Sequence, residues 1–393
     1  MTVLLLLFIL GSISFFIPYK NIKIFFVLAA IILSGLFFFY APPVSDDLYR
    51  YYQLFDTIEH LSLRAYFDGE YGTQDWLINY MLNDYKGSAL IFSSVMFVVS
   101  RTGIKEILPF VFSLITYIPL FMLVYEVCTD NKYSKRTMCL CFVLLLSCID
   151  FRFVSCLRNL SAYSIFVYTL YKDTVKKSKP LICIIGYLVA CGIHLACVPL
   201  VIMRFLAIAV TGRFKWGIVV ALLFIRRLAL LIASLLNIFF GGNFLISQLV
   251  KKIQIYFVER TSYNSNGALF FCAVIIIVAF IYFALKKDRV IPKVYKKYEA
   301  VYLYSAAFTV GCIGQYDILM RNCELVVILA IPFVLHFING RFVLESGNIR
   351  IISSYQKLYR DVIICVCFVG LVLISFLFYT LFSYIPMDVY FWR

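Results

Sequence analysis

Residues 104–128, IKEILPFVFSLITYIPLFMLVYEVC, are the stretch that decides the class of fold. The run is apolar over more than the roughly 20 residues that a helix needs to cross the hydrocarbon core of a bilayer. Comparable runs recur along the chain, of whose 393 residues 63% are hydrophobic and only 15% are charged. A soluble domain carries about a quarter of its residues as charged side chains. The sequence therefore predicts an all-α, polytopic membrane protein.

Basic residues gather in the short segments between the apolar runs. The formal net charge is +15, and segments rich in Lys and Arg normally face the cytoplasm. Since this placement accounts for the charge, the expected partner is the lipid bilayer, and no nucleic acid is expected. The segments lie at about 132–136, 172–179, 213–215, 286–297 and 341–360.

The positive-inside pattern orients the first spans. Residues 2–18 lack the basic start and the small-residue cleavage site of a signal peptide, so they are expected to be a helix that stays in the membrane. Lys20 and Lys23 place the next turn in the cytoplasm, and a second span is expected at 22–40. Residues 41–87 then emerge on the outer side.

The outer segment 41–87 has the opposite charge to the rest of the chain. It carries eight carboxylates against three basic residues. A second polar outer loop is expected at 241–266. Between the first loop and the span at 104–128, residues 88–100 are apolar but too few to cross, so they are expected to form a re-entrant or interfacial segment. In total the chain, 1–393, is expected to be a single integral membrane domain with roughly 11–13 transmembrane helices.

Two later stretches have interrupted spans. Residues 181–211 have basic segments at both ends and His194 near the middle, which predicts a pair of short helices with the histidine at the outer apex. Residues 216–240 are expected to cross outward, although Arg226 and Arg227 interrupt them. The thirteen cysteines show neither a CxxC pair nor metal-binding spacing, so no metal or other cofactor is expected.

Ionisable residues at membrane depth are costly, and they usually face a protein interior or a watery cavity. Guanidinium groups bind phosphate oxygens in a bidentate fork, so several of them on one membrane face suit a diphosphate. An imidazole can accept the proton of a sugar hydroxyl. For each arginine taken singly, the alternative is that it only reaches to the interface. The candidates are Arg152, Arg158, Arg226, Arg321 and His194.

The first outer loop holds a pattern typical of a carbohydrate subsite. In SDDLYRYYQLF, residues 45–55, Asp47 and Tyr51 are four apart, as are Asp46 and Arg50. In a helix each pair lies on one face, where a carboxylate can bind hydroxyls and an aromatic ring can cover a sugar face. The alternative is a solvated amphipathic helix that rests on the membrane.

The order of these motifs resembles the Wzy/EpsG-type polysaccharide polymerases. The matching stretches are SDDLYRYYQLF with Asp47 and Tyr51, CLRNLSAY with Arg158, VACGIHLACVPL with His194, and QYDILMRNCEL with Arg321. The resemblance covers about residues 30–340. The chain departs from the family pattern in having Ser45-Asp46 before the acid, Asn159 after the first arginine and Leu195 after the histidine.

The resemblance implies a metal-independent, GT-C-like membrane glycosyltransferase without a cofactor. Such an enzyme joins glycans carried on undecaprenyl diphosphate at the outer leaflet of the bacterial cytoplasmic membrane, with its site facing the periplasm or exterior. Arg158 and Arg321 would bind the diphosphate, and His194, or secondly Asp47, would be the general base. The further substrate-binding residues are expected to be Arg50, Tyr51, Tyr52, Arg152, Asn159 and Arg226.

Further partners expected on this basis are a chain-length regulator and a flippase of the same pathway. Two alternatives stay open at the level of sequence. A GT-C transferase that uses a lipid-monophosphate sugar would also place acids such as Asp46 and Asp47 in its first outer loop. A lipid-linked oligosaccharide flippase or other transporter would also hold cationic residues in a cavity.

Overall fold

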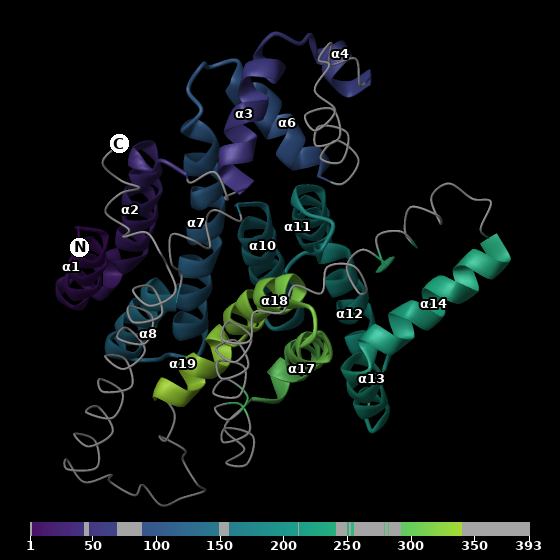
Figure 1. Ribbon diagram of the computed structural model, residues 1–393. Coiled ribbons are helices and arrows are strands. Elements are labelled where there is room, and N and C mark those ends of the chain that lie inside the picture. The colour runs from purple at the N-terminus through teal and green to yellow at the C-terminus, as the bar shows by residue number, and fades with distance from the viewer. Residues whose placement is uncertain are drawn as a thin grey trace, which may run out of the picture. The chain divides into compact units, whose positions relative to one another are not determined.

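The computed structural model describes residues 2–42, 47–68, 89–148, 157–210, 212–240 and 292–339, together with isolated positions at 250, 253, 254, 279 and 282 (Figure 1). Over these ranges the chain forms fifteen α-helices and short 3-10 turns, with no strand. The all-α prediction is confirmed for the described part of the chain. The expected second outer loop falls outside it, apart from three single residues, and so do Arg152 and the segment after residue 339.

Two helical stretches in the described ranges are long and apolar enough to cross a membrane. They are Tyr19–Phe39, of 21 residues, and Ile107–Asp130, of 24 residues. The number rises to four if each of two bent helix pairs counts as one span. Shorter apolar helices accompany them, so the chain has the composition and helices of a multi-pass membrane protein.

The chain divides into two compact units. Unit 1 comprises Met1–Tyr168, Ile185–Leu195 and Val334–Arg393, and unit 2 comprises Thr169–Ile184 and Ala196–Phe333. The helices of unit 1 are α1 (Thr2–Phe16), α2 (Ile22–Gly35), α3 (Asp47–Glu59), α4 (Leu63–Asp68), α6 (Leu90–Ser100), α7 (Ile107–Asp130) and α8 (Lys135–Cys148), with most of α10 (Leu157–Thr174) and of α11 (Pro180–Ile193).

Unit 1 is built around α7. Helix α2 packs along α7, α8 lies beside it, and α6 packs against it and carries α3 (Figure 1). Aromatic rings fill the centre, with the ring centroids of Phe26 and Phe142 4.6 Å apart and those of Phe121 and Phe142 5.0 Å apart. These buried rings hold α2, α7 and α8 together.

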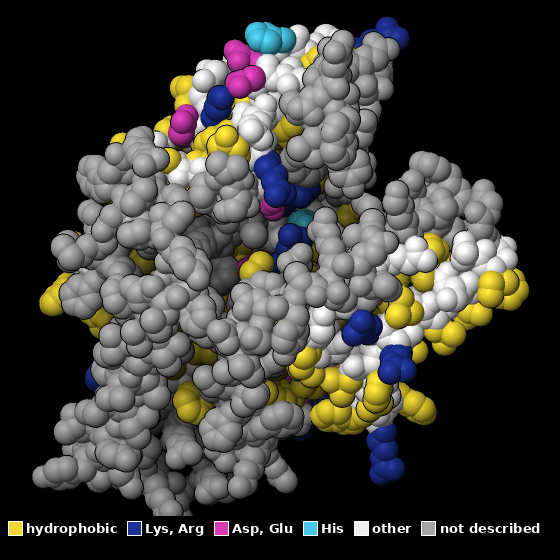
Figure 2. Space-filling view, viewed as in Figure 1, with side chains coloured by type: hydrophobic (Ala, Val, Ile, Leu, Met, Phe, Trp, Pro, Cys, Tyr) yellow, Lys and Arg dark blue, Asp and Glu magenta, His cyan; other side chains and the backbone are white. Residues whose placement is uncertain are grey.

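The acidic segment is helical where the structure describes it. Helix α3 buries Leu48, Tyr51, Leu54, Phe55 and Ile58, and its other positions are half-buried or exposed. Charged side chains gather over α3 and α4 in Figure 2. The exposed Arg101, which follows α6, donates hydrogen bonds to the backbone carbonyls of Glu59 and Leu61 and so fixes the far end of α3.

The segment predicted to be re-entrant or interfacial is α6, a single helix of eleven residues. At 1.5 Å per residue it is about 16 Å long, roughly half the hydrocarbon thickness. The structure therefore agrees with the expectation that this segment is too short to cross.

Unit 2 is organised around α17 (Lys296–Gly311). Helices α12 (Cys197–Ala209), α13 (Phe214–Leu223) and α18 (Tyr316–Leu329) all pack against α17. Helix α14 (Ile225–Phe240) follows α13 after a break and is bent from it by 83°. The stretch predicted as one interrupted crossing is therefore two helices, broken immediately before Arg226 and Arg227.

Close approach of α17 and α13 depends on Gly311. A Cβ atom at this position would overlap the carbonyl oxygen of Leu222 and would lie 3.0 Å from that of Leu223. Both are backbone atoms, which cannot turn away as a side chain can. The last turn of α17 therefore requires a glycine.

We predict that Gly311→Ala destabilises unit 2 by about 1–3 kcal/mol, because the added methyl group forces α17 away from α13. Thermal unfolding of the purified chain in detergent measures this. Gly217→Ala is the matched control, since a Cβ at Gly217 in α13 meets nothing within 4 Å. Equal stability of the two variants would contradict the packing described here.

Candidate functional site

Arg158, the second residue of α10, contacts Tyr51 of α3 across 107 positions of sequence. Its Nε donates a hydrogen bond of 2.9 Å to the phenolic oxygen of Tyr51. The Tyr51 side chain is buried, at 1% exposure, whereas Arg158 is half-buried. Two residues that the sequence singled out from separate motifs therefore meet in the structure.

An aromatic ring from α6 completes the surroundings of this guanidinium. The Arg158 Cζ lies 5.4 Å from the ring centroid of Phe92 and 5.8 Å from that of Tyr51. The two rings are themselves 5.0 Å apart, and Phe92 packs in turn on Phe112 of α7 at 4.9 Å. Cation–π contacts of this kind favour a fixed position for the cation. Phe92 could not be singled out from the sequence, because it lies in an apolar run of ordinary composition.

Two buried hydroxyls hold α10 against α7 beside Arg158. The Oγ1 of Thr116 and the Oγ of Ser161 lie 2.9 Å apart, and Ser161 also donates to the carbonyl oxygen of Phe112 at 2.9 Å. Both side chains are buried. Because these bonds are shielded from water, they fix the rotation of α10 and hence the direction in which Arg158 points.

Asn159 follows Arg158 and is buried, at 4% exposure. Its Oδ1 has no hydrogen-bond partner within the part of the chain that the structure describes. Leaving such an acceptor unpaired costs about 1–3 kcal/mol. A polar atom kept at this cost next to an arginine is a reasonable candidate for substrate binding.

Asp47 and Arg50 occupy the first turn of α3. Arg50 Nη1 lies 3.6 Å from Asp47 Oδ1, and both side chains are substantially exposed. An exposed pair of this kind contributes little to stability. Asp47 is four residues before Tyr51, so it lies on the same side of α3 as the contact with Arg158. Asp46 lies outside the described residues.

His194 lies in the break between α11 and α12, as the sequence predicted, and is half-buried. Two residues earlier, Gly192 ends α11 against the first turn of α6, where a Cβ would be 2.7 Å from Cδ1 of Ile91. Ile91 precedes Phe92, the ring under Arg158. The chain segments that carry Arg158 and His194 therefore both rest on the start of α6.

Arg321 and Arg226 belong to unit 2. Arg321 is half-buried in α18, one turn before the buried Glu324. Arg226, in the first turn of α14, is exposed and reaches the turn that leads into α18, where its Nη1 is 3.2 Å from the position of a Cβ on Gly314. Within unit 2 these two arginines are thus associated with the same helix.

Within the described ranges, no three His, Cys, Asp or Glu side chains come together as a metal site would need. Independence from a metal therefore stays a prediction of the sequence. The described site consists of one guanidinium held by two rings, an unpaired amide oxygen, and a nearby carboxylate.

No known protein family, curated protein or solved structure matches this chain. The interpretation of the site therefore rests on its own geometry and on the motifs in the sequence.

We predict that Tyr51→Phe lowers the stability of unit 1 by about 1–2 kcal/mol, since it removes a hydrogen bond from a charged donor and keeps the ring. Tyr125→Phe in α7 is the control, a half-buried tyrosine of unit 1 that lies outside this contact. A double-mutant cycle with Arg158→Lys, followed by thermal unfolding, measures the coupling. Full additivity of Tyr51→Phe and Arg158→Lys would mean that the contact does not contribute.

Proposed function

We propose that this chain is a membrane glycosyltransferase that polymerises undecaprenyl-diphosphate-linked oligosaccharide repeat units into a surface polysaccharide. The observation that carries the proposal is the hydrogen bond between Arg158 and Tyr51. These residues come from two of the four motifs by which the chain resembles polysaccharide polymerases. Their contact, with Asp47 one turn away, is what a shared substrate site requires.

In the proposed reaction, Arg158 and Arg321 bind the diphosphate of the donor. The acceptor hydroxyl oxygen forms a bond to the anomeric carbon of the donor glycan, and the bond from that carbon to the diphosphate oxygen breaks. The leaving lipid diphosphate keeps the electron pair, so negative charge grows on it. Positioned guanidinium groups lower the barrier by stabilising this charge.

The proton of the acceptor hydroxyl needs a base. His194 is the proposed general base because a neutral imidazole can accept a proton at ordinary pH. Asp47 is the second choice for the base. It lies beside Arg50 in the first turn of α3, one turn before Tyr51. Arg50, Tyr51 and Tyr52 would lie on the acceptor side, with Asn159, Arg152 and Arg226 as further substrate-binding residues.

The proposal includes the architecture and location of the enzyme. The full chain would have 11–13 spans with a GT-C-like arrangement in the bacterial cytoplasmic membrane. Its site would face outward, so that both lipid-linked substrates enter from the outer leaflet. A chain-length regulator and a flippase of the same pathway would act with it.

We predict that Arg158→Ala and Arg321→Ala each reduce polymer formation by about 10²–10³-fold, the usual effect of removing one group that stabilises developing charge. Polymer length is read on gels from cells whose only copy of the protein is the variant, with membrane expression matched. Arg213→Ala is the control, since Arg213 is an exposed arginine outside the proposed site. Polymer of normal length and amount from both alanine variants would remove the diphosphate assignment.

A further inference from the structure

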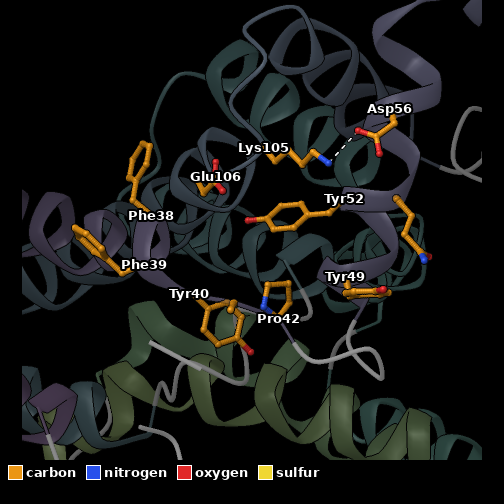
Figure 3. Close-up of a pocket in the computed structure, with 11 residues that line it drawn as sticks. Phe38, Phe39, Tyr40, Pro42, Tyr49, Tyr52, Asp56, Lys105 and Glu106 are labelled. Carbon is orange, nitrogen blue, oxygen red and sulfur yellow. Dashed lines mark ion pairs between the residues drawn. The ribbon is translucent and has the colours of Figure 1, made fainter. Parts of the chain in front are cut away.

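A pocket opens beside α3, lined by Tyr49, Tyr52 and Asp56 of that helix (Figure 3). Its volume is about 690 Å³, which falls in the range of about 300–1,000 Å³ usual for small-molecule sites. Its walls are the residues after α2, one face of α3 and the residues before α7. Its aromatic and charged lining includes Tyr40, Tyr49, Tyr52, Asp56, Lys105 and Glu106.

Helix α3 presents two faces with different chemistry. Leu48, Tyr51 and Phe55 are buried toward α6. The lining positions 49, 52, 53 and 56 follow the spacing of a second helical face. Since Tyr51 and Tyr52 are adjacent, the helix places the contact with Arg158 on one side and the pocket on the other.

The pocket combines aromatic faces with fixed carboxylates. In Figure 3 the ring of Tyr52 extends across the pocket, with its hydroxyl toward Glu106 and with the rings of Tyr40 and Tyr49 on the opposite wall. Lys105 Nζ lies 2.9 Å from Oδ1 of Asp56. This exposed ion pair lies at the edge of the pocket, and the Asp56 carboxylate keeps further lone pairs for hydroxyl donors.

The hydroxyl of Tyr52 is buried without a hydrogen-bond partner in the described part of the chain. Burial, and secondly the nearby Glu106 carboxylate, raises the pKa of this phenol well above its usual value. The phenol is therefore a neutral donor at every physiological pH. Together with the Glu106 carboxylate beside it, whose oxygens accept hydrogen bonds, it suits a ligand that carries hydroxyl groups.

Charge selects among such ligands. The lining holds two carboxylates, Asp56 and Glu106, and one ammonium, Lys105, which is already paired. A phosphate or a uronate would meet net negative charge here. A neutral sugar, or one with an amino group, would not.

We propose that this pocket binds neutral or amino-sugar residues of a glycan, with the rings of Tyr49 and Tyr52 against the sugar faces and Asp56 and Glu106 accepting their hydroxyls. The binding itself stands on the pocket. The assignment of these sugars to the acceptor chain of the polymerisation rests on the proposed function. In that case the pocket extends the acceptor side, to which Tyr52 is assigned, along the second face of α3.

The test is binding of the purified full chain in detergent to an array of bacterial surface glycans that includes neutral, amino-sugar, uronic-acid and phosphorylated members. The wild type is expected to bind neutral or amino-sugar glycans and not the anionic ones. Tyr52→Ala and Glu106→Gln are each expected to weaken that binding at least tenfold, and Tyr52→Phe is expected to weaken it less than Tyr52→Ala.

The matched controls are Tyr19→Ala and Glu59→Gln, an exposed tyrosine and an exposed glutamate outside the pocket, which are expected to bind as the wild type does. Size-exclusion profiles establish that each variant is folded. If Tyr52→Ala does not fold, Glu106→Gln alone tests the pocket. The proposal is overturned if the wild type binds no glycan, if it prefers anionic ones, or if the pocket variants bind as the controls do.

Polymer formation by the wild type is measured separately. If the wild type builds polymer but binds no array glycan through Tyr52, the sugar-binding role of the pocket is wrong and the proposed function stands. If the wild type binds glycans through Tyr52 but builds no polymer, the sugar-binding role of the pocket stands and the proposed function is wrong.

Discussion

The contact of Arg158 with Tyr51 and Phe92 is the constraint on which the candidate site depends. It joins three helices, α10, α3 and α6, that are far apart in sequence. This guanidinium contacts two neighbouring rings and is carried by a helix that the buried Thr116 and Ser161 hydroxyls fix, so its direction is restricted. Such a cation can meet a developing negative charge without rearrangement, which is what electrostatic catalysis requires.

The short helix α6 is the common support of this site. Phe92 lies under Arg158, Ile91 receives the end of α11 at Gly192 before His194, and the following Arg101 holds the carbonyls at the end of α3. With eleven residues, α6 is too short to cross the hydrocarbon. Helix α3 packs on α6. Its Tyr51 contacts Arg158, and its Tyr52 lines the proposed sugar-binding pocket.

The sequence predicted the helical class, the short segment at 88–100 and the paired short helices around His194, because hydropathy and charge placement are local signals. It also singled out Tyr51 and Arg158, whose roles stay predictions. It could not predict that Tyr51 and Arg158 touch, or that Phe92 lies beneath them. Long-range contacts leave no mark in one sequence, and an aromatic residue in an apolar run is compositionally ordinary. The sharp bend before Arg226 was foreseen only as an interruption, and Arg152 stays a prediction since it lies outside the described residues.

Reconstitution tests the central claim most directly. The purified full chain is placed in liposomes with an undecaprenyl-diphosphate-linked repeat unit, and the glycans are separated by size. The account predicts a ladder whose steps equal one whole repeat unit, formed by the wild type and lost in Arg158→Ala. Products lengthened by single sugars would instead indicate a lipid-monophosphate transferase. Movement of the lipid-linked glycan across the bilayer without any lengthening would indicate a transporter and would contradict the account.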